Sequence, residues 1–195
     1  MLPGLRSDGK VKVTDCCKLD FVDNDFHHPN FERHLSVVKQ VKPKYATAPD
    51  LFTPERLPEV LEQASILAKY AENVIVIPKC SGVIGLIPKE YVIGISVPSK
   101  YGDSGSLHYI EVYGRNVHLL GGSPHKQYRL WRDFPGMNVV SIDGNAYMKS
   151  ATFGDFWDAD RCGWNRSLRG KGYRREDLIK MSIDNIVRFW REKGL

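Results

Sequence analysis

The sequence predicts an α/β protein with parallel strands, built as a compact or incomplete (β/α) barrel. Short apolar runs recur along the chain, helix-like stretches separate most of them, and most runs end at a residue capable of chemistry. Such alternation is typical of parallel βα units, whose ligands bind at the carboxyl ends of the strands. About six or seven units fit into 195 residues. Because a closed eight-stranded barrel usually needs roughly 250 residues, an open doubly wound sheet is the alternative.

Six segments are expected to be strands because apolar and β-branched residues fill them. They are Leu19–Asp23, Tyr45–Ala48, Val74–Ile77, Ile93–Val97, Val117–Leu120 and Val139–Ile142. Val11–Val13 could form a further short strand near the start. Continuous apolar runs such as Val74–Ile77 favour strands that are buried on both faces, as in parallel sheets.

Helices are expected where apolar residues recur with a period of 3.6. These segments are Phe31–Val41, the stretch from Thr53 to Ala71, the stretch from Pro124 to Phe134, Ala146–Trp157 and 176–193. Gly-rich Ser81–Ile87 replaces a helix in one crossover, and Leu107–Tyr113 suits either a short helix or a strand. We therefore expect a single domain over 1–195, with a basic loop at 158–175 and a C-terminal helix at 176–193.

The composition indicates a soluble protein. Hydrophobic residues make up 42% of the chain and charged residues 26%, which is ordinary for a globular domain. No apolar run reaches the roughly 18 residues of a membrane span, and the N-terminus lacks a signal-peptide core, so we expect a cytoplasmic protein without a membrane partner. The net charge of +5 is compatible with a polyanionic partner.

The pattern of cysteines and histidines predicts neither a metal nor another cofactor. The four cysteines, Cys16, Cys17, Cys80 and Cys162, form no C-x-x-C pair. The acids and histidines of the segment DFVDNDFHH lack the ligand spacing of a common metal site, so a solvated loop is expected there.

Three aspartates stand where apolar runs end, and they are the candidate catalytic and binding acids. Asp23 ends the first core run, Asp50 follows Tyr45–Ala48, and Asp143 follows Val139–Ile142. A carboxylate that projects from a strand end into a pocket can act as a nucleophile or a base. The alternatives are structural: Asp50 could cap a helix, and Asp143-Gly144 could form a plain turn.

Other residues at strand ends are candidates for substrate binding. Gly121, Gly122 and Ser123 connect a strand to a helix whose free N–H groups could bind a phosphate or a base carbonyl; a tight turn with a serine cap would explain them equally. Asn145 adds a polar group beside Asp143, and Lys79 ends the third core run. No base lies nearby in sequence to support a Schiff-base lysine or a nucleophilic Cys80.

The stretch 161–175 is the candidate nucleic-acid-binding segment. It holds six basic residues and no acid: Arg161, Arg166, Arg169, Lys171, Arg174 and Arg175. Interleaved Trp164 and Tyr173 suit stacking on bases, and the basic residues suit phosphate contacts. A solvated basic loop is the alternative interpretation.

The motifs DNDF, KPKYATAPD, VHLLGGSP and VVSIDG, in this order, resemble the tRNA-guanine transglycosylase superfamily. The sequence is most similar to its short phage and archaeal members, which include enzymes that insert 7-deazaguanines into DNA. The resemblance spans roughly residues 19–157. It implies a (β/α) barrel that exchanges a guanine-like base, a purine or 7-deazapurine, in DNA or tRNA.

The resemblance also implies roles for individual residues. Asp143 would be the nucleophile, Asp23 the general acid/base and Asp50 the acid that holds the incoming base, with Gly121 and Gly122 under the substrate. The superfamily's tRNA enzymes carry a Cys/His zinc site near the C-terminus. Here only Cys162 lies in that region, so no zinc is expected.

Three functions thus compete. The first is glycosyl transfer by base exchange on nucleic acid, through an aspartate nucleophile. The second is an enzyme that acts on a nucleoside or a phosphorylated small molecule with the same aspartates. The third is a non-catalytic barrel that binds nucleic acid.

Overall fold

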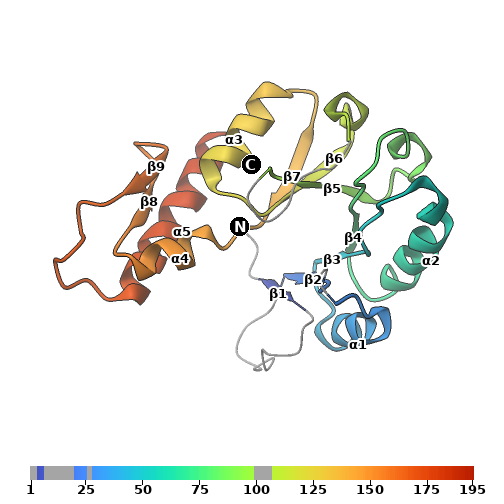
Figure 1. Ribbon diagram of the computed structural model, residues 1–195, viewed down its shortest axis with the longest axis horizontal. Coiled ribbons are helices and arrows are strands. Elements are labelled where there is room, and N and C mark those ends of the chain that lie inside the picture. The colour runs from blue at the N-terminus through green and yellow to red at the C-terminus, as the bar shows by residue number, and fades with distance from the viewer. Residues whose placement is uncertain (1–3, 7–19, 26–27, 99–106) are drawn as a thin grey trace.

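The computed structural model describes residues 4–6, 20–25, 28–98 and 107–195. Its main sheet has seven parallel strands in the order β1-β2-β3-β4-β5-β6-β7, so each strand pairs with the one before it in the chain. Figure 1 shows this sheet curled into a half-barrel with β1 and β7 at its two edges. The α/β class is confirmed, and the barrel is incomplete.

The six predicted strands are all confirmed, with small shifts of their ends. They are β2 (Phe21–Asp23), β3 (Tyr45–Thr47), β4 (Asn73–Val76), β5 (Val92–Ser96), β6 (Asn116–Leu120) and β7 (Asn138–Ile142). The first strand, β1 (Gly4–Arg6), was not expected from the sequence. The predicted strand Val11–Val13 lies outside the described residues.

Helices cover the outside of the sheet in the crossovers that follow β2, β3 and β6. The structure has α1 (Phe31–Val41), α2 (Leu57–Leu67) after a short 3-10 turn η1 (Pro54–Arg56), and α3 (Pro124–Asp133). In the crossovers after β4 and β5, the described residues form 3-10 turns, η2 (Ile84–Leu86) and η3 (Tyr109–Val112), and no α-helix. The ambiguous Leu107–Tyr113 therefore contains a helical turn and no strand.

The helix predicted over Ala146–Trp157 is wrong in its second half. The observed α4 spans only Ala146–Thr152. Gly154 then adopts φ +78°, a left-handed conformation that ends helices. Trp157 is fully buried instead, and its backbone N–H donates to Ser182 Oγ at 3.0 Å. Tertiary packing thus takes these residues out of the helix.

The C-terminal part forms a hairpin against a long helix. Strands β8 (Phe156–Asp158) and β9 (Gly163–Asn165) pair antiparallel, so the predicted basic loop 158–175 is wrong in part. The last helix, α5 (Arg175–Glu192), begins one residue before the predicted 176–193. Figure 1 shows the hairpin lying away from the half-barrel, with α5 between the hairpin and α3.

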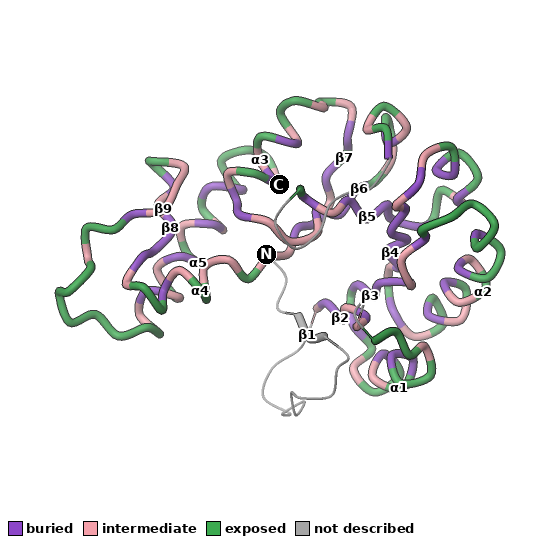
Figure 2. The backbone as a smooth tube through the Cα atoms, in the orientation of Figure 1, coloured by how far each residue is buried: buried purple, intermediate pink, exposed green. Residues whose placement is uncertain are grey.

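Two apolar layers flank the sheet. The larger lies between the strands and the outer helices, and the strands appear as the most buried parts of the chain in Figure 2. The smaller layer fills the inside of the half-barrel and consists of Phe21, Tyr45, Ile75, Ile77 and Val92. Gly94 faces the same interior, where an added Cβ would lie 2.8 Å from both Ile75 and Ile77. The interior is therefore filled with apolar side chains around Gly94, which leaves the carboxyl ends of the strands as the polar edge of the half-barrel.

Candidate active site

Three aspartates meet at the carboxyl edge of the half-barrel. Asp23 ends β2, Asp50 follows β3, and Asp143 follows β7. The pKa of the Asp23 carboxyl is raised from 3.8 to about 7, mainly by burial and then by the negative charges of Asp143 and Asp50. The three aspartates therefore stand at one edge of the sheet, with Asp23 within electrostatic reach of Asp143 and Asp50.

A hydrogen-bonded frame holds Asp23 against β3. The hydroxyl of Thr47 donates to Asp23 Oδ1 at 3.0 Å, and the backbone N–H of Asn24 donates to Thr47 Oγ1 at 2.8 Å. The Asn24 amide donates to the carbonyl of Ala48 at 2.9 Å, and His34 Nε2 of α1 lies 2.8 Å from the Thr47 carbonyl. The side chain of Asp23 is therefore fixed by two neighbouring strands and a helix.

Asp143 is held through both its carboxylate and its backbone. The Gly121 N–H donates to Asp143 Oδ1 at 2.7 Å, and His118 Nε2 lies 3.4 Å from the same oxygen. The Gln127 amide of α3 donates to the carbonyl of Asp143 at 2.5 Å and to that of Gly121 at 2.8 Å. The turns that follow β6 and β7 are thereby joined into one unit.

Asp50 and Lys79 form a largely buried charge pair at the same edge. Lys79 Nζ lies 3.9 Å from Asp50 Oδ2 and donates to Ser96 Oγ at 2.5 Å. Burial raises the pKa of Asp50, and the positive charge of Lys79 opposes part of this rise. The pair presents a carboxylate and an ammonium group side by side, which together could recognise a planar polar ligand.

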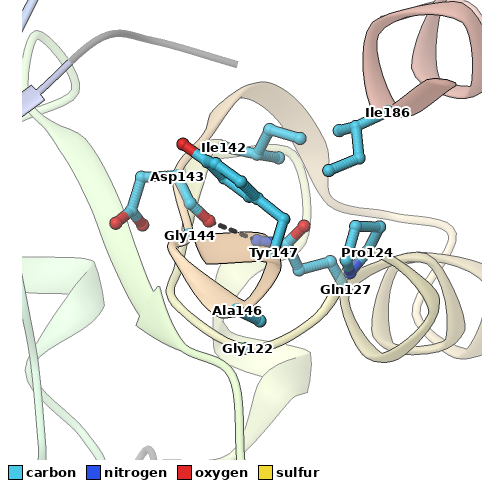
Figure 3. A pocket seen from close by; sticks show the side chains of 9 residues that line it. All are labelled: Gly122, Pro124, Gln127, Ile142, Asp143, Gly144, Ala146, Tyr147 and Ile186. Carbon is cyan, nitrogen blue, oxygen red and sulfur yellow. Dashed lines mark hydrogen bonds between the residues drawn. The ribbon is translucent and has the colours of Figure 1, made fainter. Parts of the chain in front are cut away.

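A small cavity lies on the other side of the Asp143 backbone, between β7, α3, α4 and α5 (Figure 3). Its volume of about 10 Å³ suits roughly one water molecule. Figure 3 shows the Asp143 carboxylate pointing away from Gln127 and Ile186, which line this cavity. The nearby Tyr147 has its pKa raised by burial and by the charge of Asp143. The Asp143 carboxylate therefore faces away from this cavity, toward the side of the sheet where His118 lies.

The other predicted binding residues differ in their placement. Gly121 and Gly122 have φ of +65° and +74°, and a Cβ on Gly122 would lie 2.7 Å from Val97 Cγ1. Ser123 precedes α3, and its hydroxyl lies 3.2 Å from His125 Nε2. Asn145 is exposed at the start of α4. Thus Gly121 touches the candidate nucleophile directly, whereas the contacts of Ser123 and Asn145 indicate turn and helix-start positions.

Cys80 does not have the surroundings of a nucleophile. It is buried, its Sγ lies 3.7 Å from the carbonyl of Leu51, and burial raises the pKa of its thiol. In the described parts of the chain, no three His, Cys, Asp or Glu side chains are grouped to hold a metal ion. None of the described helices is long and apolar enough to cross a membrane.

Most of the predicted phosphate-binding arginines are paired with carboxylates of the chain itself. Arg169 makes a two-pronged contact with buried Asp155, at 2.5 and 2.8 Å, and Arg166 lies 3.8 Å from the same carboxylate. Other pairs are Arg161 with Asp158 at 3.8 Å and Arg174 with Asp177 at 3.1 Å, and Arg175 Nε donates to Thr152 Oγ1 at 3.3 Å. Lys171 is exposed. The positive charge of this stretch is thus partly neutralised by acids just outside it.

Several residues that shape the site carry no clear signal in the sequence. Thr47, His118 and Ser96 lie within β3, β6 and β5, and in the sequence nothing distinguishes them from other polar residues within apolar runs. Gln127 sits in the middle of α3. A polar side chain that alternates with apolar ones along a buried strand is the only available signal for the first three, because it must face the barrel interior.

Comparison with known proteins gives one match. The model of a protein family covers residues 1–191, nearly the whole chain. The chain belongs to DUF6610, a family of unknown function. No curated protein and no solved structure matches it. The DUF6610 chain therefore has to be interpreted from its own site.

Proposed function

We propose that this DUF6610 protein exchanges a guanine-like base, a purine or 7-deazapurine, in DNA or RNA. The observation that carries the proposal is the different setting of two neighbouring carboxyl groups. Asp23 keeps its proton up to about pH 7, whereas Asp143 is oriented by a backbone N–H. Glycosyl transfer needs such a pair, one group to move protons and one to attack the sugar.

The step can be written with these residues. An Asp143 carboxylate oxygen attacks the sugar C1′ while the bond from C1′ to the base nitrogen breaks, and the bonding electrons leave with the base. The Asp23 carboxyl gives its proton to the departing base, which leaves neutral. In the second half, the Asp23 carboxylate takes a proton from the incoming base. The base nitrogen then attacks C1′ and releases the Asp143 carboxylate.

In this proposal, Asp50 and Lys79 supply the binding edge for the base. A guanine-like ring presents N–H donors beside a carbonyl oxygen along one edge. The Asp50 carboxylate accepts such N–H groups, and Lys79 Nζ, 3.9 Å away, donates to a carbonyl. Binding also gains from the low exposure of both side chains, because charge-assisted hydrogen bonds are stronger away from water.

The direct test is an exchange assay. The protein should incorporate labelled guanine or a labelled 7-deazaguanine into duplex DNA or bulk tRNA that already contains guanine. Incorporation into either polymer supports the proposal and identifies the nucleic acid. Failure with both polymers and both bases would contradict it.

A nucleic-acid substrate also predicts salt-dependent binding through the 161–175 stretch. Arg166, Lys171 and Arg174 are the appropriate targets, because Arg169 is committed to buried Asp155. Replacing all three by alanine should weaken DNA or tRNA binding and lower the slope of log affinity against log salt by about one unit for each lost phosphate contact. Lys69→Ala, near α2, is the control. An unchanged slope in the triple variant would show that the stretch does not bind phosphates.

One observation favours a second candidate, an enzyme acting on free nucleosides. The pairing of Arg161, Arg166 and Arg169 with acids of the chain leaves less positive charge for a polyanion. Base exchange with labelled guanine and free guanosine, without dependence on salt, would identify this activity. The same carboxylates would serve both reactions.

A further inference from the structure

His118 is a buried polar residue that the proposed reaction does not yet use. It lies on the inner face of β6, with no exposed surface. Its ring stacks on Phe21, with 5.1 Å between the centroids and 16° between the planes, and lies 6.4 Å from the ring of Tyr45. The aromatic contacts fix the plane of the imidazole, so its two nitrogens point in defined directions.

A bulge in β7 determines which side chains contact the two imidazole nitrogens of His118. Val117 pairs with Val139, but His118 pairs with Ser141, so Val140 is the extra residue. Bulges of this kind re-aim side chains and are frequent beside active sites. Here the shift brings Ser141 Oγ to 2.7 Å from His118 Nδ1 and puts Ser141 and Asp143 on the same inner face.

The other nitrogen faces the candidate nucleophile. His118 Nε2 lies 3.4 Å from Asp143 Oδ1, and it makes no hydrogen bond within the described part of the chain. A lone pair on Nε2 would repel the carboxylate, whereas an N–H would be attracted to it. We therefore place a proton on Nε2, and Nδ1 then accepts a hydrogen bond from the Ser141 hydroxyl. A contact of 3.4 Å is long for a hydrogen bond, but such contacts often tighten when substrate binds.

The two groups that contact the Asp143 carboxylate both approach its Oδ1 oxygen. Gly121 N–H donates to Oδ1 at 2.7 Å, and His118 approaches that oxygen as well. Among the described residues, no hydrogen bond to Oδ2 is found. The two carboxylate oxygens are thus not equivalent.

We infer that His118 is a positioning residue which, with the Gly121 N–H, binds Asp143 Oδ1 and leaves Oδ2 as the oxygen that attacks the sugar. This inference rests on the proposed base exchange for the role of Oδ2. The Asp143 carboxylate sets the tautomer of His118, Ser141 Oγ holds its Nδ1 at 2.7 Å, and the bulge at Val140 sets the position of Ser141. The arrangement orients the carboxylate before substrate arrives, which lowers the cost of reaching the attacking geometry.

A first experiment needs no substrate. Nitrogen-15 NMR of the imidazole in the wild-type protein should show a protonated Nε2 on His118, assigned by its loss in His118→Phe or, if that variant does not fold, in His118→Gln. A neutral ring with its proton on Nδ1 would overturn the inference. Because this measurement involves no turnover, it separates failure of the positioning role from failure of the proposed function.

A second experiment measures exchange of labelled guanine. His118→Phe keeps a ring against Phe21 but removes the donor, and it should lower kcat by roughly 10- to 100-fold with little change in KM. His118→Gln, which retains an N–H near the Nε2 position, should recover a large part of this loss. His108→Phe, at an exposed site before η3, is the matched control. Equal kcat in the wild type and in folded His118→Phe would contradict the role of His118.

Discussion

Replacing Asp143 by asparagine is expected to abolish base exchange, with a loss on the order of 10⁴-fold or more in kcat. The amide keeps an oxygen that can accept the hydrogen bond from Gly121 N–H, so the turn between β6 and α3 should survive. It cannot form the ester to the sugar that the proposed reaction requires of the carboxylate. Exchange of labelled guanine measures the loss, and circular dichroism measures the fold.

The control for Asp143→Asn is the same substitution at an aspartate outside the candidate site. Asp133→Asn removes an exposed carboxylate at the end of α3, which pairs with Arg132 at 2.8 Å, and should leave exchange unchanged. Undiminished exchange in Asp143→Asn would exclude Asp143 as the nucleophile. Equal losses in both variants would indicate a general effect of charge.

The second large effect is expected at Asp23. Its carboxyl binds the proton more tightly in the folded than in the unfolded chain, since its pKa rises from 3.8 to about 7. The stability due to this proton is full below about pH 4 and is lost as the pH rises through about 7. Asp23→Asn, which is always neutral, should therefore be more stable than the wild type at pH 8.5, and less so at pH 5.

The size of this gain has an upper bound. Each pKa unit corresponds to about 1.4 kcal/mol, so the shift at Asp23 allows roughly 4 kcal/mol. Urea unfolding at the two pH values measures the gain. The same variant should lose about 10²- to 10⁴-fold in exchange, as expected for a missing general acid/base. A stability difference that does not change with pH would mean that Asp23 titrates normally.

The sequence was sufficient for the architecture because apolar runs and their ends are local signals. The runs that end at Asp23 and Asp143 predicted both strands and, through the geometry of parallel sheets, the position of both aspartates at the same edge. The helix predicted over Ala146–Trp157 was wrong in its second half. There the helical periodicity competes with burial of Trp157 against α5, a later element that a local pattern does not reveal.

The finer features of the site depend on pairings that no local pattern encodes. The bulge that aligns His118 with Ser141 depends on the register of two strands. The basic stretch looked free of acids, but Asp155 and Asp177 flank it and bind its arginines. Counting the basic residues of 161–175 alone therefore overestimated the positive charge that is available to a nucleic-acid partner.

The order of strands in the sheet has a consequence for how the chain acquires its site. Because every strand pairs with its predecessor, a chain emerging from the ribosome can add β2 through β6 one at a time without waiting for distant segments. Asp23 and Asp50 belong to the early part of this sequence and Asp143 to the last strand of the sheet. A nascent chain would thus carry a folded sheet without Asp143 until β7 docks, so the proposed catalytic acids would come together only in that late step.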